Sequence, residues 1–342
     1  MEASAPPPPR TAVSAMTSIA ALAVLAATCS DDQQRSRPTP TTLLKPAHLA
    51  KDFGTRAYTH VAQVVKLGPR HAGSPGWRNG IDYIAAELAR CGLKPVRDRW
   101  RDPVEKIDFE NVHVTIPGSS RHRIVIACHH DTKNFTGHDD PHNNFHFVGA
   151  NDSGSGVGLL LALAPILKNR QNRATIQLVF FDGEESLELA WNPKRSLFGS
   201  RRFLSQNRSS PIPGKPQSRI RCLILLDMIG AKDLQIDDDL NSDPDLKAIF
   251  LAAAAGCGHK HLMYENQRSI SDDHLPFLEK GIPAIDLIDL ADNPQWHTRD
   301  DTLDHISAES LRIVAQIVLT ALPTVEDRYF PKKGKISLPN KR

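Results

Sequence analysis

The chain has 342 residues and a formal net charge of +3, with 42 Lys and Arg against 39 Asp and Glu. Its 40% hydrophobic and 24% charged residues are ordinary for a globular protein and exclude a collagen, a coiled coil and a wholly disordered chain. Because the charges nearly balance and the body has no long basic run, bulk charge gives no basis for nucleic-acid binding.

The two ends of the chain differ from the body. Ser18 to Ala27 form an apolar stretch with the length of a signal-peptide core, too short to span a bilayer, and Cys29 follows as in bacterial lipoprotein signals. We expect residues 1–29 to be a signal or lipoprotein-type segment that exports the protein to a periplasm or anchors it to a membrane. The alternative is a disordered extension rich in Ala and Pro. Residues 30–45 are typical of a polar linker, 46–330 of a single α/β domain, and 331–342 of a basic tail.

Helical and strand-like patterns alternate along the body. In chain order they predict a helix over 77–91, strands over 111–117 and 123–128, a helix over 154–167, a strand over 174–181, a helix over 196–204, a strand over 220–226, a helix over 244–255, a strand over 283–290 and a helix over 307–322. Several strands are nearly continuous apolar runs, which is typical of a mostly parallel sheet buried on both faces. No internal repeat is visible, so we expect one domain.

The chain has five cysteines, and none forms a CxxC pair, which speaks against a structural zinc site of that kind. Cys128 and Cys222 lie in apolar strand-like runs, so we expect both to be small core residues. Spacing alone leaves open whether any bridge forms.

Acids and histidines follow four of the predicted strands. His129, Glu185 and Asp227 come at or just after strand ends, Asp152 opens a helix, and His297 follows the last strand through a short loop. Because ligands of open parallel sheets bind beyond the carboxyl ends of the strands, we expect these five groups to converge on one crevice.

Imidazole and carboxylate together are the ligands of catalytic zinc sites, which keep one position open for water or substrate. Asp131 lies two residues after His129, on the same side of an extended strand, and can orient its imidazole. His130 then points away, and we expect a packing role for it.

Glu184 and Glu185 form the most informative pair. Adjacent carboxylates at a strand end are costly unless their charges are separated. A metal on one and a proton on the other would separate them, so one Glu would be a ligand and its neighbour a general acid and base. The alternative is an exposed acidic turn, and the other candidate ligands in register favour the metal interpretation.

The motifs HHD, GANDSGSG, FFDGEE, LLDMIGA and WHT occur in this order. They resemble the zinc-dependent aminopeptidase-like exopeptidases, including the cyclising branch of that superfamily, the glutaminyl cyclases. The segment GPRHAGSPGWRNGIDYIAAEL resembles their N-terminal part, so the resemblance spans residues 60–322. It implies a three-layer αβα sandwich with a mostly parallel central sheet.

Three features resemble the cyclase branch in particular. These are the stretch from Trp191 to Arg201, the stretch SDDHLPFLEKGIP that begins at Ser271, and Trp296 directly before His297. Three others depart from it. GANDSGSG is at least as similar to the peptidase version, Asp286 stands where animal cyclases have His, and the loop 291–295 lacks the aromatic residue that lines their pocket.

For a cyclase, the resemblance implies one zinc ion held by Asp152, Glu185 and His297. Glu184 would carry protons, with the carboxylates of Asp227 and Asp272 beside it. Trp191 and Trp296 would wall the substrate pocket, Phe277 and Leu278 would belong to the core, and the role of Lys133, structural or substrate-binding, stays open.

The expected substrates are peptide or protein N-termini with glutamine, which cyclises to pyroglutamate. We expect no nucleic-acid partner, membrane contact only through a lipid at Cys29, and a monomer. Two alternatives remain: an aminopeptidase with a second zinc ion at His129 and Asp227, and a non-catalytic scaffold that keeps the fold. The scaffold is disfavoured because no ligand is lost.

Overall fold

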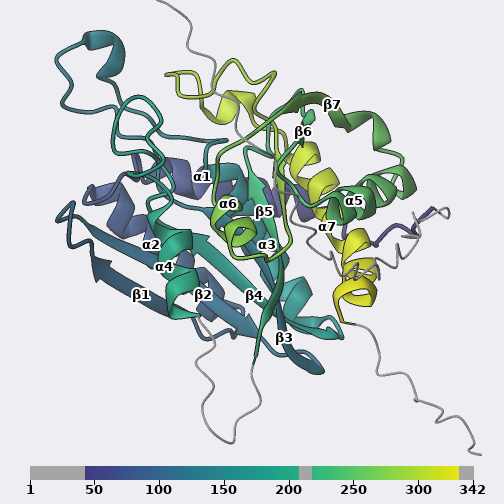
Figure 1. Cartoon of the computed structure of the whole chain (residues 1–342). Coiled ribbons are helices and arrows are strands. Elements are labelled where there is room, and N and C mark those ends of the chain that lie inside the picture. Colours follow the sequence, from purple (N-terminus) through teal and green to yellow (C-terminus); the bar gives the residue numbers. More distant parts are fainter. Residues whose placement is uncertain (1–42, 208–217, 331–342) are drawn as a thin grey trace, which may run out of the picture. The chain divides into compact units, whose positions relative to one another are not determined.

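The computed structural model describes residues 43–207 and 218–330, which belong to one compact unit (Figure 1). The expected leader with Cys29, nearly all of the expected linker and the basic tail lie outside the described residues.

A six-stranded sheet with the order β1-β2-β4-β3-β5-β8 forms the centre of the unit. Strands β3, β4, β5 and β8 are parallel to one another, and β1 and β2 join this core antiparallel beside β4. The prediction of a mostly parallel sheet is therefore confirmed. The bounds of the six strands are β1 Val96–Arg101, β2 Asp108–Ile116, β3 Ser120–His129, β4 Ala174–Phe181, β5 Ile220–Asp227 and β8 Ala284–Ile288.

A second, two-stranded parallel sheet pairs β6 (Ile236–Asp239) with β7 (Met263–Arg268). The α-helices are α1 Phe53–Lys66, α2 Pro75–Arg90, α3 Gly154–Asn169, α4 Phe198–Gln206, α5 Pro244–Gly256, α6 Leu275–Glu279 and α7 Ala308–Tyr329. Short 3-10 helices lie at Pro141–Asn143, Lys260–Leu262 and Leu303–His305.

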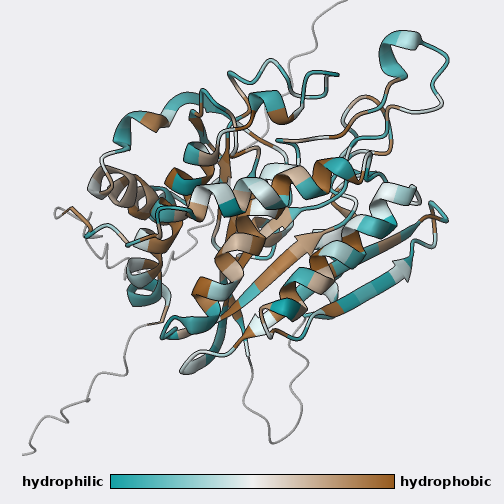
Figure 2. Ribbon diagram, turned by 180° about the vertical axis from the view of Figure 1, so that it is seen from behind, coloured by the Kyte–Doolittle hydropathy of each residue, from teal (hydrophilic) through white to brown (hydrophobic). Residues whose placement is uncertain are grey.

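Side-chain alternation along the central strands builds the two faces of the sheet. In β3, Ile124 and Ile126 pack in the large core beneath α1, α2, α3, α5 and α7, whereas Val125 and Ala127 face α4 and α6. Figure 2 shows these central strands as hydrophobic ribbons and the edge strand β1 as largely hydrophilic. The expected three-layer αβα architecture follows from this two-sided burial.

The contact between α1 and α3 is close because α3 carries glycine where the helices meet. A Cβ atom at Gly158 would lie 2.8 Å from the carbonyl oxygen of Ala57, and one at Gly156 would lie 2.6 Å from the carbonyl oxygen of Leu226. The glycines of GSGVG therefore seat α3 against both α1 and β5, which fixes the position of the loop that precedes α3.

Helix α7 is, among the described residues, the one helix long and apolar enough to cross a membrane by length and composition. Most of its apolar window is buried, and it packs against α1 and α5. It is therefore a core helix of this unit.

The ten predicted elements are all present, with ends that differ by a few residues, except that α7 continues well past residue 322 to Tyr329. Other elements were not predicted from the sequence. Helix α1 was not predicted because the apolar residues of its buried face are few and are separated by polar residues. Strand β1 was missed because its residues are all exposed or half-buried, so it has no apolar alternation. Its strand conformation comes from pairing with β2.

Candidate active site

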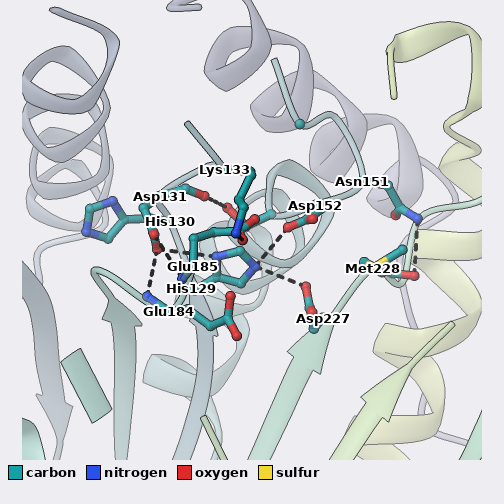
Figure 3. A network of polar contacts seen from close by, with 12 residues as sticks. His129, His130, Asp131, Lys133, Asn151, Asp152, Glu184, Glu185, Asp227 and Met228 are labelled. Atoms are coloured by element: carbon teal, nitrogen blue, oxygen red, sulfur yellow. Dashed lines mark hydrogen bonds and ion pairs between the residues drawn. The ribbon is translucent and has the colours of Figure 1, made fainter. Parts of the chain in front are cut away.

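The structure brings the five groups expected at the strand ends into one cluster, and Figure 3 shows four of them, His129, Asp152, Glu185 and Asp227. His129 is the last residue of β3, Asp227 is the last residue of β5, and Glu185 follows β4. Asp152 lies just before α3, and His297 lies in the loop after β8. The carboxyl ends of parallel strands meet at one edge of a sheet, which is why residues so distant in sequence converge here.

Asp152, Glu185 and His297 form one group that could hold a metal ion, with ligand atoms within 4.8 Å of one another. His297 Nε2 lies 3.2 Å from Asp152 Oδ2 and 3.1 Å from Glu185 Oε1. Burial lowers the pKa of His297, but Glu185 and Asp152 outweigh this effect and raise it to about 10. A proton on the imidazole or a divalent cation would balance the charge of the two buried carboxylates.

His129, Asp152 and Asp227 form a second group of the same kind. His129 Nε2 lies 3.1 Å from Asp152 Oδ1 and 3.3 Å from Asp227 Oδ1, and Figure 3 shows its ring between these two carboxylates. Burial opposes a charge on His129, but Asp227, Asp131 and Asp152 together raise its pKa well above the ordinary value. Burial raises the pKa of Asp227 to about 7, against the effect of His129.

Asp131 links the two strand ends. Its carboxylate lies 3.4 Å from His129 Nδ1 and accepts the backbone N–H groups of Glu184 and Glu185 at 3.2 and 3.3 Å. The carboxylate therefore orients the imidazole and also holds the chain at the end of β4. His130 turns away, as expected, and its Nε2 donates to the carbonyl of Glu110 at 3.0 Å.

Glu184 is buried beside this cluster, so the alternative of an exposed acidic turn does not hold. Burial, together with the charges of Asp272 and Glu185, raises the pKa of Glu184 well above the ordinary range of a carboxyl. The pKa of Asp272 is also raised, mainly by burial. A buried carboxyl with a raised pKa can hold and release a proton near neutral pH.

A pocket of about 340 Å³ opens onto these groups. Trp191 and Trp296 lie on its wall with 40% and 45% of their surfaces exposed, together with Leu189 and Leu290. A larger cavity of about 820 Å³ lies beside the first residues of β5 and β8, at the opposite end of those strands, and none of the five groups lines it.

Residues 111–322 match the family described as peptidase family M28. The chain is 31% identical over 307 residues to a glutaminyl-peptide cyclotransferase-like protein of Bos taurus, covering 82% of this chain and 73% of the relative. This chain belongs to the glutaminyl cyclase branch of peptidase family M28.

Solved structures agree with this assignment. The glutaminyl cyclase of an Acidobacteriales bacterium has a TM-score of 0.72 and 33% identity, covering 82% of this chain and 97% of that one. A leucine aminopeptidase precursor from Bacteroides thetaiotaomicron has a TM-score of 0.68 and 27% identity, covering 79% of this chain and 96% of that one. The fold is therefore shared by structures named for both activities.

Arg70 is a residue of this glutaminyl cyclase family member whose role the sequence pattern did not reveal. The side chain is fully buried, and its guanidinium donates to the carbonyls of His130, Val148 and Gly149 at 3.0, 2.7 and 2.9 Å. Arg70 thus ties the chain after β3 to the loop that carries Asp152. The motif GPRHAGS contains this residue, but its partners lie at least 60 positions away, so spacing gave no signal.

Asp301 is a second missed residue. Its carboxylate accepts the backbone N–H groups of Asn151 and Asp152 at 2.7 and 3.1 Å, which fixes the loop before α3 from the opposite side. Burial raises the pKa of Asp301 to about 7.

Asp272, His274 and Asp286 form a third, buried group of residues that could hold a metal ion, and Asp272 lines the pocket. His274 Nε2 lies 3.1 Å from Asp239 Oδ2, and His274 Nδ1 lies 3.7 Å from Asp286 Oδ2. Asp286, which departs from the His of the animal cyclases, therefore lies beside the imidazole of His274.

The structure also gives the surroundings of Lys133, of the two expected core residues and of the cysteines. Lys133 is buried and donates to the carbonyl of Ser186 at 2.9 Å, with Glu185 Oε2 at 3.7 Å. Phe277 is a core residue beneath the sheet, with Leu278 packed against the same cluster. The described cysteines, including the buried Cys128 and Cys222, are free thiols.

Proposed function

We propose that this protein converts N-terminal glutamine of peptides and proteins to pyroglutamate and releases ammonia, the activity for which its relatives are named. The observation that carries the proposal is the position of Glu184. Its buried carboxyl, with a raised pKa, adjoins a metal-ligand group at the base of a pocket walled by two exposed tryptophans.

We infer that Asp152, Glu185 and His297 hold a single zinc ion. The donor set fits, because nitrogen and oxygen atoms from three residues converge within 4.8 Å, with carboxylate charges that need a cation. When bound, zinc supplies a Lewis acid that polarises the γ-carboxamide of the substrate. Asp131 and Asp301 support this site by fixing the backbone of Glu185 and of Asp152.

Glu184 is the residue that moves the proton. The neutral α-amine of the peptide attacks the γ-carbonyl carbon, and a new C–N bond closes the ring. Glu184 accepts the proton that the amine loses and passes it to the departing nitrogen, which leaves as ammonia when the original C–N bond breaks. No water enters the reaction, and the raised pKa suits a group that both accepts and donates a proton near neutral pH.

Asp227 and Asp272 line the same pocket as Glu184 and would hydrogen-bond the amine and the departing nitrogen. Trp191 and Trp296 supply flat apolar walls for the folded conformer of the Gln side chain. Holding that conformer lowers the entropic part of the barrier to ring closure.

The test compares peptides that begin with Gln and with Leu by mass spectrometry. Loss of ammonia from the first, with the second intact, is the expected result. Glu184→Gln should retain zinc and lose about 10²- to 10⁴-fold in turnover. Glu188→Gln is a matched control, since Glu188 is exposed on the same loop and pairs with Arg195 at 2.9 Å. If Glu184→Gln releases the zinc, Glu184 is a ligand and our division of roles is wrong.

An aminopeptidase is the second candidate, and the group His129, Asp152 and Asp227 favours it because it could hold a second metal ion. In that reaction Glu184 would activate water. Release of free Leu from the second peptide, with two zinc ions per chain by metal analysis, would establish the peptidase in place of the cyclase.

We also propose that residues 1–29 direct export, with a lipid on Cys29 as the anchor. Mass spectrometry of the mature N-terminus tests this. A chain that still begins at Met1 in the cytoplasm contradicts export, and an unmodified residue 29 contradicts anchoring.

A further inference from the structure

The charges of the pocket are unevenly distributed between its interior and its mouth. Its interior is acidic, with Asp152, Glu184, Glu185, Asp227 and Asp272 in the lining. Within the described part of the chain, two cationic side chains other than histidine line the same pocket, Lys133 and Arg268. Lys133 is buried and engaged with Ser186 and Glu185, so it is not available to substrate.

Arg268, unlike Lys133, is exposed. It is the last residue of β7, and its backbone is fixed by pairing with β6, where its carbonyl accepts the N–H of Leu240 at 2.9 Å. The side chain is exposed, and no carboxylate among residues 43–207 and 218–330 lies within 4.0 Å of the guanidinium. Its charge reaches Asp237 only as a longer-range effect.

The two polar side chains directly before Arg268 are both engaged. Gln267 donates to Asp238 Oδ2 at 2.9 Å, and Asn266 donates to Asp292. Arg268 therefore presents a guanidinium at the pocket mouth. Its backbone is held by the β6–β7 pairing, and its guanidinium has no carboxylate partner among the described residues. A guanidinium of this kind binds a carboxylate through two parallel N–H···O bonds.

We propose that Arg268 binds a carboxylate of the substrate peptide, so that the enzyme prefers peptides with Asp or Glu in the first two positions after the N-terminal Gln. This inference rests on the proposed cyclase function. With Gln in the interior, the rest of the peptide must leave through the mouth, advancing about 3.5 Å per residue. Arg268 at the rim attracts a carboxylate that the peptide carries at this point.

The experiment measures kcat/KM by ammonia release for four C-terminally amidated peptides that begin Gln-Glu-Ala, Gln-Ala-Glu, Gln-Ala-Ala and Gln-Lys-Ala. Amidation removes the terminal carboxylate, and the free-acid form of the Ala peptide shows whether Arg268 also binds that group. We expect at least one Glu peptide to exceed the Ala peptide by about threefold and the Lys peptide by about tenfold at low salt. The preference should fade as ionic strength rises.

Arg268→Ala should reduce these ratios to near one, and Arg268→Glu should reverse their order. Lys260→Ala is the control, because it removes the same charge from an exposed residue outside the pocket lining and should keep the wild-type ratios. Unchanged ratios in Arg268→Ala, with cyclisation intact, would overturn this inference alone. Failure of the wild type to cyclise any Gln peptide would overturn the proposed function and this inference with it.

Discussion

Replacement of the buried Arg70 by Met is the sharpest test of how the loops at the candidate metal site are held. Met keeps most of the length of the side chain and removes the charged donor group. Three carbonyls, those of His130, Val148 and Gly149, then lose their donors, and the bonds to His130 and Gly149 are buried. The positive charge beside Asp301 and Asp152 is lost as well.

The expected loss of stability follows from these contacts. Each hydrogen bond from a charged donor contributes roughly 1.5–3 kcal/mol, and relaxation reduces the sum, so we expect Arg70→Met to lower the free energy of unfolding by about 4 kcal/mol. For a domain of this size each kcal/mol corresponds to roughly 2 °C, which gives a decrease in Tm of about 8 °C.

Thermal unfolding followed by circular dichroism measures this effect, with and without added zinc. Arg78→Met is the matched control, because Arg78 is exposed on α2 and makes one weak contact, to Gly73 at 3.4 Å. We also expect weaker zinc binding in Arg70→Met, since the loop before α3 loses its support. If the Tm values of the two variants agree within about 1 °C, the clamp assigned to Arg70 does not exist.

Three further predictions concern packing, a buried carboxylate and pH. Gly158→Ala should lower the free energy of unfolding by about 1–3 kcal/mol in urea titrations, because the new Cβ would lie 2.8 Å from the carbonyl oxygen of Ala57. Glu326→Ala should cost about 3 kcal/mol in the same assay, since it removes the ion pair to Arg170 at 2.7 Å and the acceptor for two backbone N–H groups. Burial raises the pKa of Asp289 to about 7, so the folded state favours the protonated carboxyl. The free energy of unfolding is therefore higher at low pH and falls as pH rises from about 4 to 7. Asp289→Asn should therefore have a higher Tm than wild type at pH 8 and an equal Tm near pH 4, and the reverse order would contradict this sign.

The sequence by itself determined the central sheet and the chemistry at its edge. Strands such as 174–181 and 220–226 are nearly continuous apolar runs, and a run of that kind is stable only when both faces are covered. His129, Glu185 and Asp227 stand at the ends of such strands, so their meeting at one edge followed from local pattern and parallel order.

The tertiary structure alone decided the residues that support and extend the site. Arg70 and Asp301 act on backbone groups at least 60 positions away, and nothing in their own neighbourhood indicates a partner. Strand β1 has no apolar face, and Arg268 reaches the pocket only because β7 pairs with β6. A local pattern records which side chains must be buried, whereas long-range hydrogen bonds and edge pairing depend on how the chain closes on itself, which no short stretch of sequence contains.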